Sequence, residues 1–288
     1  MFRTTLIAAT LSIAFAGAHA AQPLQVKVYN ADGNSFNVNS TLVYGEKEAM
    51  VIDAGFTRAD ALRIAANVLD SGKELKTIYV SQADPDYYFG VETLKEIFPT
   101  AEVVTTPAVL AKINAKLAGK IAFWGPKMGA NAPRTPVLPK AISGTTLTVD
   151  GQTVEIRGAT GALGHRPYAW IPSIKAVVGN IGVFGTNMHV WTADTQTVAE
   201  RSAWVAQLDE MAALQPAMVV PGHMPAGTAL DVTNVTYTKG YLQAFEKNAA
   251  AAKNSAELID AMKKAYPAAP MGLSLDIGAK VNKGEMKW

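Results

Sequence analysis

The most informative part of the sequence is Thr77-Ile-Tyr-Val-Ser-Gln-Ala-Asp-Pro-Asp-Tyr-Tyr-Phe-Gly90. It begins as a short apolar run rich in β-branched residues, continues as polar side chains able to bind a ligand, and ends at a glycine. Residues 91–98 then have the spacing of a helix. Side chains at the carboxyl end of a buried strand, just before a helix, are where α/β proteins usually hold their chemistry. The segment therefore predicts a strand, a site and a helix in that order.

Strands and helices alternate on both sides of this segment. Strands are predicted at residues 24–29, 35–44, 49–53, 77–80, 101–105, 146–149, 153–156, 169–172, 174–178 and 217–220. This order, with helices between several of the strands, predicts a layered α/β protein with mixed sheets. We expect residues 21–288 to form one domain, with a core at about 24–226 and a helical extension at about 230–267.

Local signals predict several element ends. Thr57 with Asp60 predicts a capped helix, which Gly72 ends. The pair Asp150-Gly151 between two short alternating runs predicts a β-hairpin.

The later helices are predicted from similar signals. Thr106, followed by proline, predicts a helix that runs to about Leu117. Residues 123–140 lack periodicity and are predicted to form a long loop or lid. Asp194 is expected to cap the next helix. Asn254, with a glutamate three residues later, is expected to begin the last helix, which ends near Tyr266-Pro267.

The N-terminus has the pattern of a secretory signal peptide. A basic residue, an apolar segment of about ten residues and an Ala-x-Ala site predict cleavage after Ala20. A membrane anchor needs about 20 apolar residues, and residues 17–22 are too small and polar to supply them. We therefore expect a periplasmic or secreted protein without stable membrane insertion.

Composition excludes several kinds of function. The formal net charge of +2 gives no signal for nucleic acid binding or for a charged membrane surface. The chain has no cysteine, which rules out disulfides, thiolate metal sites and cysteine nucleophiles. Composition therefore favours neither nucleic acid nor a membrane as a partner, and the oligomeric state is left open.

Three histidines follow the signal peptide. His165 and His223 each follow a glycine at a predicted strand end, and His189 lies between them. A lone histidine is more often a structural residue than a ligand. Two histidines in Gly-His loops, together with the polar segment at 81–86, favour a single site to which all of them contribute.

These features together resemble the metallo-β-lactamase fold superfamily. The resemblance rests on five motifs in order, covering roughly residues 35–226: Val51-Ile-Asp-Ala-Gly55, the segment 77–90, Gly164-His165, Val178-Gly-Asn180 and Pro221-Gly-His223. It implies a four-layer αβ/βα sandwich with added C-terminal helices. The export signal and those helices also resemble the virulence-type metallohydrolases of that superfamily.

The metal-binding motif departs from the family pattern. In the family motif His-x-His-x-Asp-His, this chain has Gln82 and Asp84 in place of the first two histidines, and Tyr87 in place of the third. Asp86 matches the aspartate, while Asn180 replaces the aspartate that bridges two metal ions. The resemblance implies a first metal site formed by Gln82, Asp84 and His165, and a second formed by Asp86 and His223, with Tyr87 beside it.

The chemistry of these donors favours one metal ion over two. Carboxylate and imidazole are competent zinc ligands, amide oxygen is weaker and neutral tyrosine is poor. With Asn180 in place of the bridging aspartate, the site lacks a negative charge that would reduce the repulsion between two close dications. A site with mostly oxygen ligands is also less selective for zinc and can bind manganese or iron. The alternative is a metal-free remnant in which Asp84 and Asp86 only cap the helix at 91–98.

The leading functional hypothesis is a metal-dependent hydrolase that cleaves an ester, lactone or amide bond of a small molecule with metal-activated water. The resemblance gives Asp86 the role of orienting that water and moving its proton. Tyr87 or Tyr88 would donate to the oxyanion. The residues His189, Trp191 and Trp124 lie in segments that could line a substrate cleft, although simple packing is the commoner role of such side chains. The rival hypothesis is a non-catalytic, exported ligand-binding protein on the same fold.

Other catalytic and ligand-binding motifs are incomplete or absent in the sequence. Asp84-Pro-Asp86 is similar to the aspartate pair of haloacid-dehalogenase-type phosphatases, but tyrosines follow it. A calcium loop of the EF-hand type needs glycine and glutamate where Phe89 and Lys95 stand. There is no Gly-x-Ser-x-Gly elbow and no phosphate-binding glycine loop.

Overall fold

The computed structural model describes residues 22–269 and 272–288, so the predicted signal peptide at 1–20 lies outside the described residues. The first of two sheets contains six strands in sequence order. Its first three strands pair antiparallel and the remaining strands pair parallel. The strands are β1 (Gln25–Asn30), β2 (Asn39–Tyr44), β3 (Glu48–Ile52), β4 (Glu74–Tyr79), β5 (Glu102–Thr105) and β6 (Lys140–Ala141).

The second sheet has five strands in the order β11-β10-β9-β8-β7. Its strands pair antiparallel except at the edge, where β11 runs parallel to β10. The strands are β7 (Thr146–Val149), β8 (Gln152–Arg157), β9 (Tyr168–Ile171), β10 (Ala176–Val178) and β11 (Met218–Val219).

The two sheets share an apolar layer. Met50 and Ile52 of β3 lie in the same buried cluster as Ile156 of β8 and Val178 of β10. Val51, between the two β3 residues, belongs to a different cluster on the opposite face of the first sheet. Because successive side chains of a strand point to opposite faces, both faces of each sheet are buried and need a covering layer.

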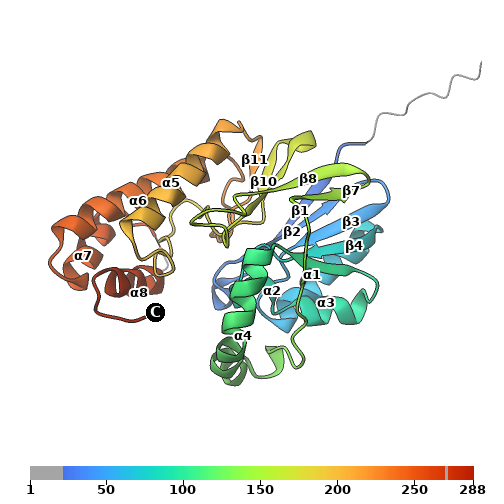
Figure 1. The fold of residues 1–288 in the computed structure, drawn as a ribbon, viewed down its shortest axis with the longest axis horizontal. Coiled ribbons are helices and arrows are strands. Elements are labelled where there is room, and N and C mark those ends of the chain that lie inside the picture. The colour runs from blue at the N-terminus through green and yellow to red at the C-terminus, as the bar shows by residue number, and fades with distance from the viewer. Residues whose placement is uncertain (1–21, 270–271) are drawn as a thin grey trace, which may run out of the picture.

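Helices supply the two outer layers. The first sheet packs against α1 (Arg58–Ser71), α3 (Val91–Ile97) and α4 (Pro107–Met128), with the single turn α2 (Pro85–Tyr88) beside them. The second packs against α5 (Val198–Ala213), α6 (Thr233–Ala251), α7 (Ser255–Ala265) and α8 (Gly272–Asn282). Figure 1 shows these two groups of helices apart from each other, with α5–α8 at the left and α1–α4 below the sheets. The predicted αβ/βα sandwich with C-terminal helices is confirmed.

Several local predictions are confirmed. The Thr57 side chain accepts from the Asp60 N–H, the Asp60 carboxylate accepts from the Thr57 N–H, and Gly72 ends α1 with positive φ. Asp150 and Gly151 both have positive φ, as a two-residue hairpin turn requires.

The loop predicted at 123–140 is wrong over its first part. Helix α4 does not stop near Leu117 but continues to Met128, with Pro126 close to its end. Residues 115–122 are mostly strong helix formers, and Trp124 packs against Phe36 and Phe56. Packing of the helix against the core therefore overrides the breakers that the sequence suggested.

Three further predictions are corrected. Thr197, not Asp194, caps α5, in a capping box with Glu200. Strand β2 begins at Asn39 rather than at residue 35, because Phe36 and Asn37 both have positive φ. The helix that ends at Ala265 is not the last, since α8 follows it and buries Leu275 and Ala279.

Among the described residues, none of the helices combines the length and the apolar character needed to cross a bilayer.

Two glycine substitutions test the packing. A Cβ on Gly90 would lie 2.0 Å from the carbonyl oxygen of Ala54, whereas a Cβ on Gly119 would meet nothing within 4 Å. We expect Gly90→Ala to destabilise the protein by more than about 2 kcal/mol, because the backbone must move. Gly119→Ala should stabilise α4 by about 0.5–1 kcal/mol. Urea denaturation of both variants gives the comparison, and equal effects of the two substitutions would contradict this packing.

Candidate functional site

The loop that follows β4 is anchored to the end of β3. The Ala54 N–H donates to the carbonyl of Tyr87 at 2.8 Å, and the Gly90 N–H donates to the carbonyl of Gly55 at 3.1 Å. Gly90 has no side chain, and this lets the two backbones approach closely. The loop 80–90 is thereby fixed at the carboxyl edge of the first sheet.

Asp53 supports the same edge from beneath. Its buried carboxylate accepts from the backbone N–H and the hydroxyl of Ser81, each at 2.7 Å. Burial raises the pKa of Asp53 to about 8, although the two bonds from Ser81 oppose the shift. Asp53 also has a φ of 68°, a conformation that aspartate and asparagine adopt more readily than most residues.

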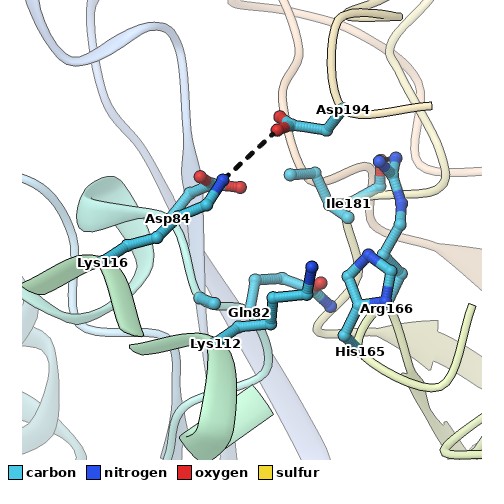
Figure 2. Close-up of a pocket in the computed structure, with 9 residues that line it drawn as sticks. Gln82, Asp84, Lys112, Lys116, His165, Arg166, Ile181 and Asp194 are labelled. Atoms are coloured by element: carbon cyan, nitrogen blue, oxygen red, sulfur yellow. Dashed lines mark hydrogen bonds and ion pairs between the residues drawn. The ribbon is translucent and has the colours of Figure 1, made fainter. Parts of the chain in front are cut away.

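A cavity of about 60 Å³ lies where this edge meets the second sheet (Figure 2). The structure brings Gln82, Asp84 and His165 together there, the three residues expected to hold a first metal ion. The other residues that line it are Ala83, Lys112, Lys116, Arg166, Ile181 and Asp194. Sequence reasoning missed the lysines, Arg166 and Asp194 as site residues.

Helix α4 places its lysines along one face above the cavity. Lys112 and Lys116 are one turn apart, and Lys120 follows at the same spacing. The Lys116 ammonium lies 3.9 Å from Asp194, and that of Lys120 lies 3.8 Å from Asp84. This repeat was visible in the sequence, but the helix was expected to end before Lys120.

Arg166 is buried at the opposite wall, with 4% of its surface exposed. Its guanidinium carbon lies 4.4 Å from the centre of the Trp204 ring, and its Nη2 donates to the carbonyl of Ile181 at 3.4 Å. Among the described residues, its Nε–H has no acceptor.

His165 carries no charge at neutral pH. Burial lowers its pKa to about 4, and the nearby charges of Lys112 and Arg166 act in the same direction. The charge around the cavity therefore comes from carboxylates and from lysine and arginine.

Asp194 is fixed by two indole groups. Its carboxylate accepts from Trp191 at 2.7 Å and from Trp288 at 2.9 Å. Burial alone would raise the pKa of Asp194, but Arg166 and the two indole N–H groups bring it below its usual value. Asp194 is consequently ionised at neutral pH. Trp191, predicted on the substrate side, lies behind Asp194 and does not line the cavity.

Asp86 and His223 form a separate buried pair. His223 Nε2 lies 3.6 Å from an Asp86 oxygen, while its Nδ1 is 2.9 Å from the carbonyl of Phe36. A carbonyl can only accept, so Nδ1 carries the proton of the neutral ring and Nε2 faces the carboxyl group. Burial lowers the pKa of His223 to about 4 and raises that of Asp86 to about 7.

The remaining predicted residues have structural partners. The Tyr87 hydroxyl donates to the carbonyl of Asn180 at 3.2 Å, and the Asn180 side chain links Val220 to Val183. These residues lie elsewhere than on the cavity wall, as does His189, which is 3.0 Å from the hydroxyl of Tyr241 on α6. Tyr88 packs in the core of the first helical layer, and its buried hydroxyl has no partner among the described residues.

The fold can be compared with those of known proteins. The family model described as "Metallo-beta-lactamase superfamily" matches residues 33–175. The chain belongs to the metallo-β-lactamase fold superfamily. No curated protein matches the chain.

Solved structures of that superfamily share its fold. A metallo-beta-lactamase family protein from Thermus thermophilus is 16% identical with a TM-score of 0.61, over 91% of this chain and 92% of that one. The DIM-1 metallo-beta-lactamase exposed to ceftazidime is 16% identical with a TM-score of 0.56, over 78% and 99%. VMB-1 is 19% identical with a TM-score of 0.55, over 80% and 94%. At these identities the likeness establishes the fold.

Membership suggests metal-dependent hydrolase chemistry, and members of the superfamily typically bind zinc. The residues of this chain do not fit such an ion. Within residues 22–269 and 272–288, no three His, Asp or Glu side chains gather as a metal site would require. Asp86 and His223 are only two donors, and the Tyr87 hydroxyl beside them already donates to a carbonyl.

The first set of expected ligands is no better suited. Gln82 uses its amide nitrogen to bond the carbonyl of Pro167, and Asp84 is paired with Lys120. A dication at the cavity would also meet the positive charges of Lys112, Lys116 and Arg166. These like charges disfavour a dication there, and among the three expected ligands only the Asp84 carboxylate and the His165 imidazole are strong metal donors.

The raised pKa of Asp53 predicts a pH dependence of stability. A carboxyl group whose pKa rises from 3.8 to about 8 on folding favours the folded state fully below 3.8, and this contribution is lost as the pH rises to about 8. We expect Asp53→Asn to remove this loss, making the variant the more stable protein at pH about 9 by on the order of a few kcal/mol. Urea denaturation across the pH range measures it.

Asp60 supplies the matched control, because its pKa is shifted the other way. Burial would raise this pKa, but hydrogen bonds from Ser35, Thr57 and Tyr29 lower it. Asp60→Asn should therefore cost stability at neutral pH, and less as the pH falls below the usual range of aspartate. If both variants show the same pH profile, the assignment of Asp53 as a destabilising buried acid is wrong.

Proposed function

We propose that this protein binds a small molecule in the cavity between α4 and Arg166, without a metal ion and without hydrolysing it. The observation that carries the proposal is the position of Lys112, Lys116 and Arg166 around Gln82, Asp84 and His165. Side-chain cations occupy the surroundings of the expected first metal ion. The sequence put metal-dependent hydrolysis first and ligand binding second, and the donor set favours the opposite order.

Side-chain cations do part of what a metal ion does. They attract and orient an electronegative group, but they supply no open coordination position at which water loses a proton. The neutral His165 lines the same cavity and can bond a ligand without adding charge, whereas the Asp86–His223 pair lies outside the cavity. The proposed place of action is the periplasm or the exterior, on the basis of the predicted signal peptide.

Metal-dependent hydrolysis of an ester, lactone or amide is the second candidate. One observation favours it: Gln82, Asp84 and His165 line a common cavity, as a first metal site of this superfamily requires. In that case one zinc, manganese or iron ion would be held there, and substitution of either cavity residue Asp84 or His165 would release it.

Metal content separates the two candidates. Protein purified without chelator should contain well under one metal ion per chain, and His165→Ala and His223→Ala should leave this content unchanged. His189→Ala is the matched control, since His189 bonds to Tyr241 in the helical extension. One metal ion per chain that disappears in His165→Ala, together with hydrolysis of an ester, lactone or amide, would refute the proposal.

Ligand binding has its own test. A thermal-shift screen of small metabolites against chelator-treated protein should find compounds that raise the Tm, because a ligand that binds only the folded state stabilises it. Added zinc should not be needed for the shift. Failure of every compound until zinc is restored would favour the second candidate.

The altered donors can also be reversed. Gln82→His, Asp84→His and Tyr87→His together supply the histidines of the family motif, and His165, Asp86 and His223 are already in place. We expect zinc affinity to rise by at least about tenfold, measured by calorimetry. Adding Lys116→Ala should raise it further by removing a positive charge. An unchanged affinity would show that these positions do not correspond to those of the family motif.

A further inference from the structure

Arg166 has an incomplete set of partners. It is 4% exposed, yet it makes no ion pair of 4.0 Å or less with a carboxylate of the described residues. Among the described residues, the one hydrogen bond of its guanidinium, to the carbonyl of Ile181, is long at 3.4 Å, and its Nε–H has no acceptor. Buried charges are normally paired, because removing them from water is costly. Arginine also stays protonated in proteins.

The lysines of α4 extend this positive surface. Figure 2 shows Lys112 and Lys116 on one wall of the cavity and Arg166 on the other. The contact of Lys116 with Asp194 is long at 3.9 Å, and Lys112 has no carboxylate within ion-pair distance among the described residues.

The charges that line the cavity do not cancel. Lys112, Lys116 and Arg166 contribute three positive charges, against two negative charges from Asp84 and Asp194. Asp84 is further offset by Lys120 at 3.8 Å. A net positive, partly enclosed site attracts an anion more strongly than the same charges do in open water.

The size of the cavity limits what enters it. Sites that enclose a whole drug-sized molecule have volumes of roughly 300–1,000 Å³. About 60 Å³ accommodates a single small group. The rest of the ligand must therefore extend outside the cavity towards solvent.

We propose that the cavity binds the oxyanion head group, a carboxylate or a phosphate, of a small molecule, with Arg166 as its principal partner and Lys112 and Lys116 as the others. The inference rests on the proposed ligand-binding function and specifies its ligand. The planar guanidinium offers parallel N–H donors that match two oxygens of such a group, and an unpartnered Nε–H is one of them. The lysines add charge from the opposite wall, without a fixed geometry.

Phosphate and acetate are the probes, each titrated into chelator-treated full-length protein at constant ionic strength. The readout is the ¹H–¹⁵N signal of the Arg166 Nε–H, assigned by its disappearance in Arg166→Lys. We expect a saturable change of this signal, because the unpartnered N–H acquires an acceptor. The probe that binds more tightly identifies the head group as phosphate or carboxylate.

Charge variants of one helix provide the comparison. Lys116→Met should weaken binding of the tighter probe by about threefold or more, because the cavity loses one of its three positive charges. Lys127→Met, also on α4, should change affinity by less than about twofold, since Lys127 donates to the carbonyl of Phe123 and does not line the cavity. Lys112→Met repeats the test at a second position, should Arg166→Lys not fold.

The proposal is overturned if neither probe gives a saturable change, or if Lys112→Met and Lys116→Met bind as the wild type does. These outcomes differ from failure of the ligand-binding function itself. That function fails if one metal ion per chain is present and required, whereas the oxyanion proposal fails if metal-free protein binds only uncharged compounds.

Discussion

The apolar layer between the two sheets is the constraint on which the rest of the structure depends. Met50 and Ile52 of one sheet share it with Ile156 and Val178 of the other. Since both sheets are also apolar on their outer faces, each must be covered by helices, which gives the four layers. Because the faces of both sheets are covered by apolar layers, the polar side chains that follow the strands lie at the edge where the two sheets meet.

At that edge, this chain keeps the architecture of a metal site but changes its charges. The loop 80–90 is fixed by backbone bonds to Ala54 and Gly55, just after β3, and these bonds do not use the side chains of Gln82, Asp84 or Tyr87, so the fold tolerates replacement of the ligands. Asn180 illustrates the exchange. The family motif has a carboxylate at this position, whereas the side-chain amide of Asn180 bonds backbone groups of residues 183 and 220 and links the two loops.

The electrostatics of the cavity follow from two elements far apart in sequence. Helix α4 contributes lysines from the first half of the chain, and the loop between β8 and β9 contributes His165 and Arg166. Burial keeps His165 neutral, so the lysines and Arg166 dominate. Arg166 and two indole N–H groups keep Asp194 ionised, and the negative charge of Asp194 balances part of the positive charge of the lysines and Arg166.

Much of the fold was predictable because it depends on local chemistry. The capping box at Thr57, the hairpin turn at Asp150-Gly151 and the alternation of β3 each express a preference of neighbouring residues. The errors occurred where distant contacts prevail. Trp124 packs against Phe36 and Phe56, which carries α4 past its expected end, and Asp194 bonds to indole groups instead of capping a helix.

The sequence by itself determined the superfamily, the succession of strands and helices, and the presence of Gln82, Asp84, Asp86, His165 and His223 in loops that follow strands, because periodicity and motifs can be read along the chain. Only the tertiary structure decided which of these residues meet. It separates the Asp86–His223 pair from the cavity at Gln82, and it surrounds that cavity with Lys112, Lys116 and Arg166. The charge of a site is the sum over side chains brought together by packing, and no single segment of the sequence contains that sum.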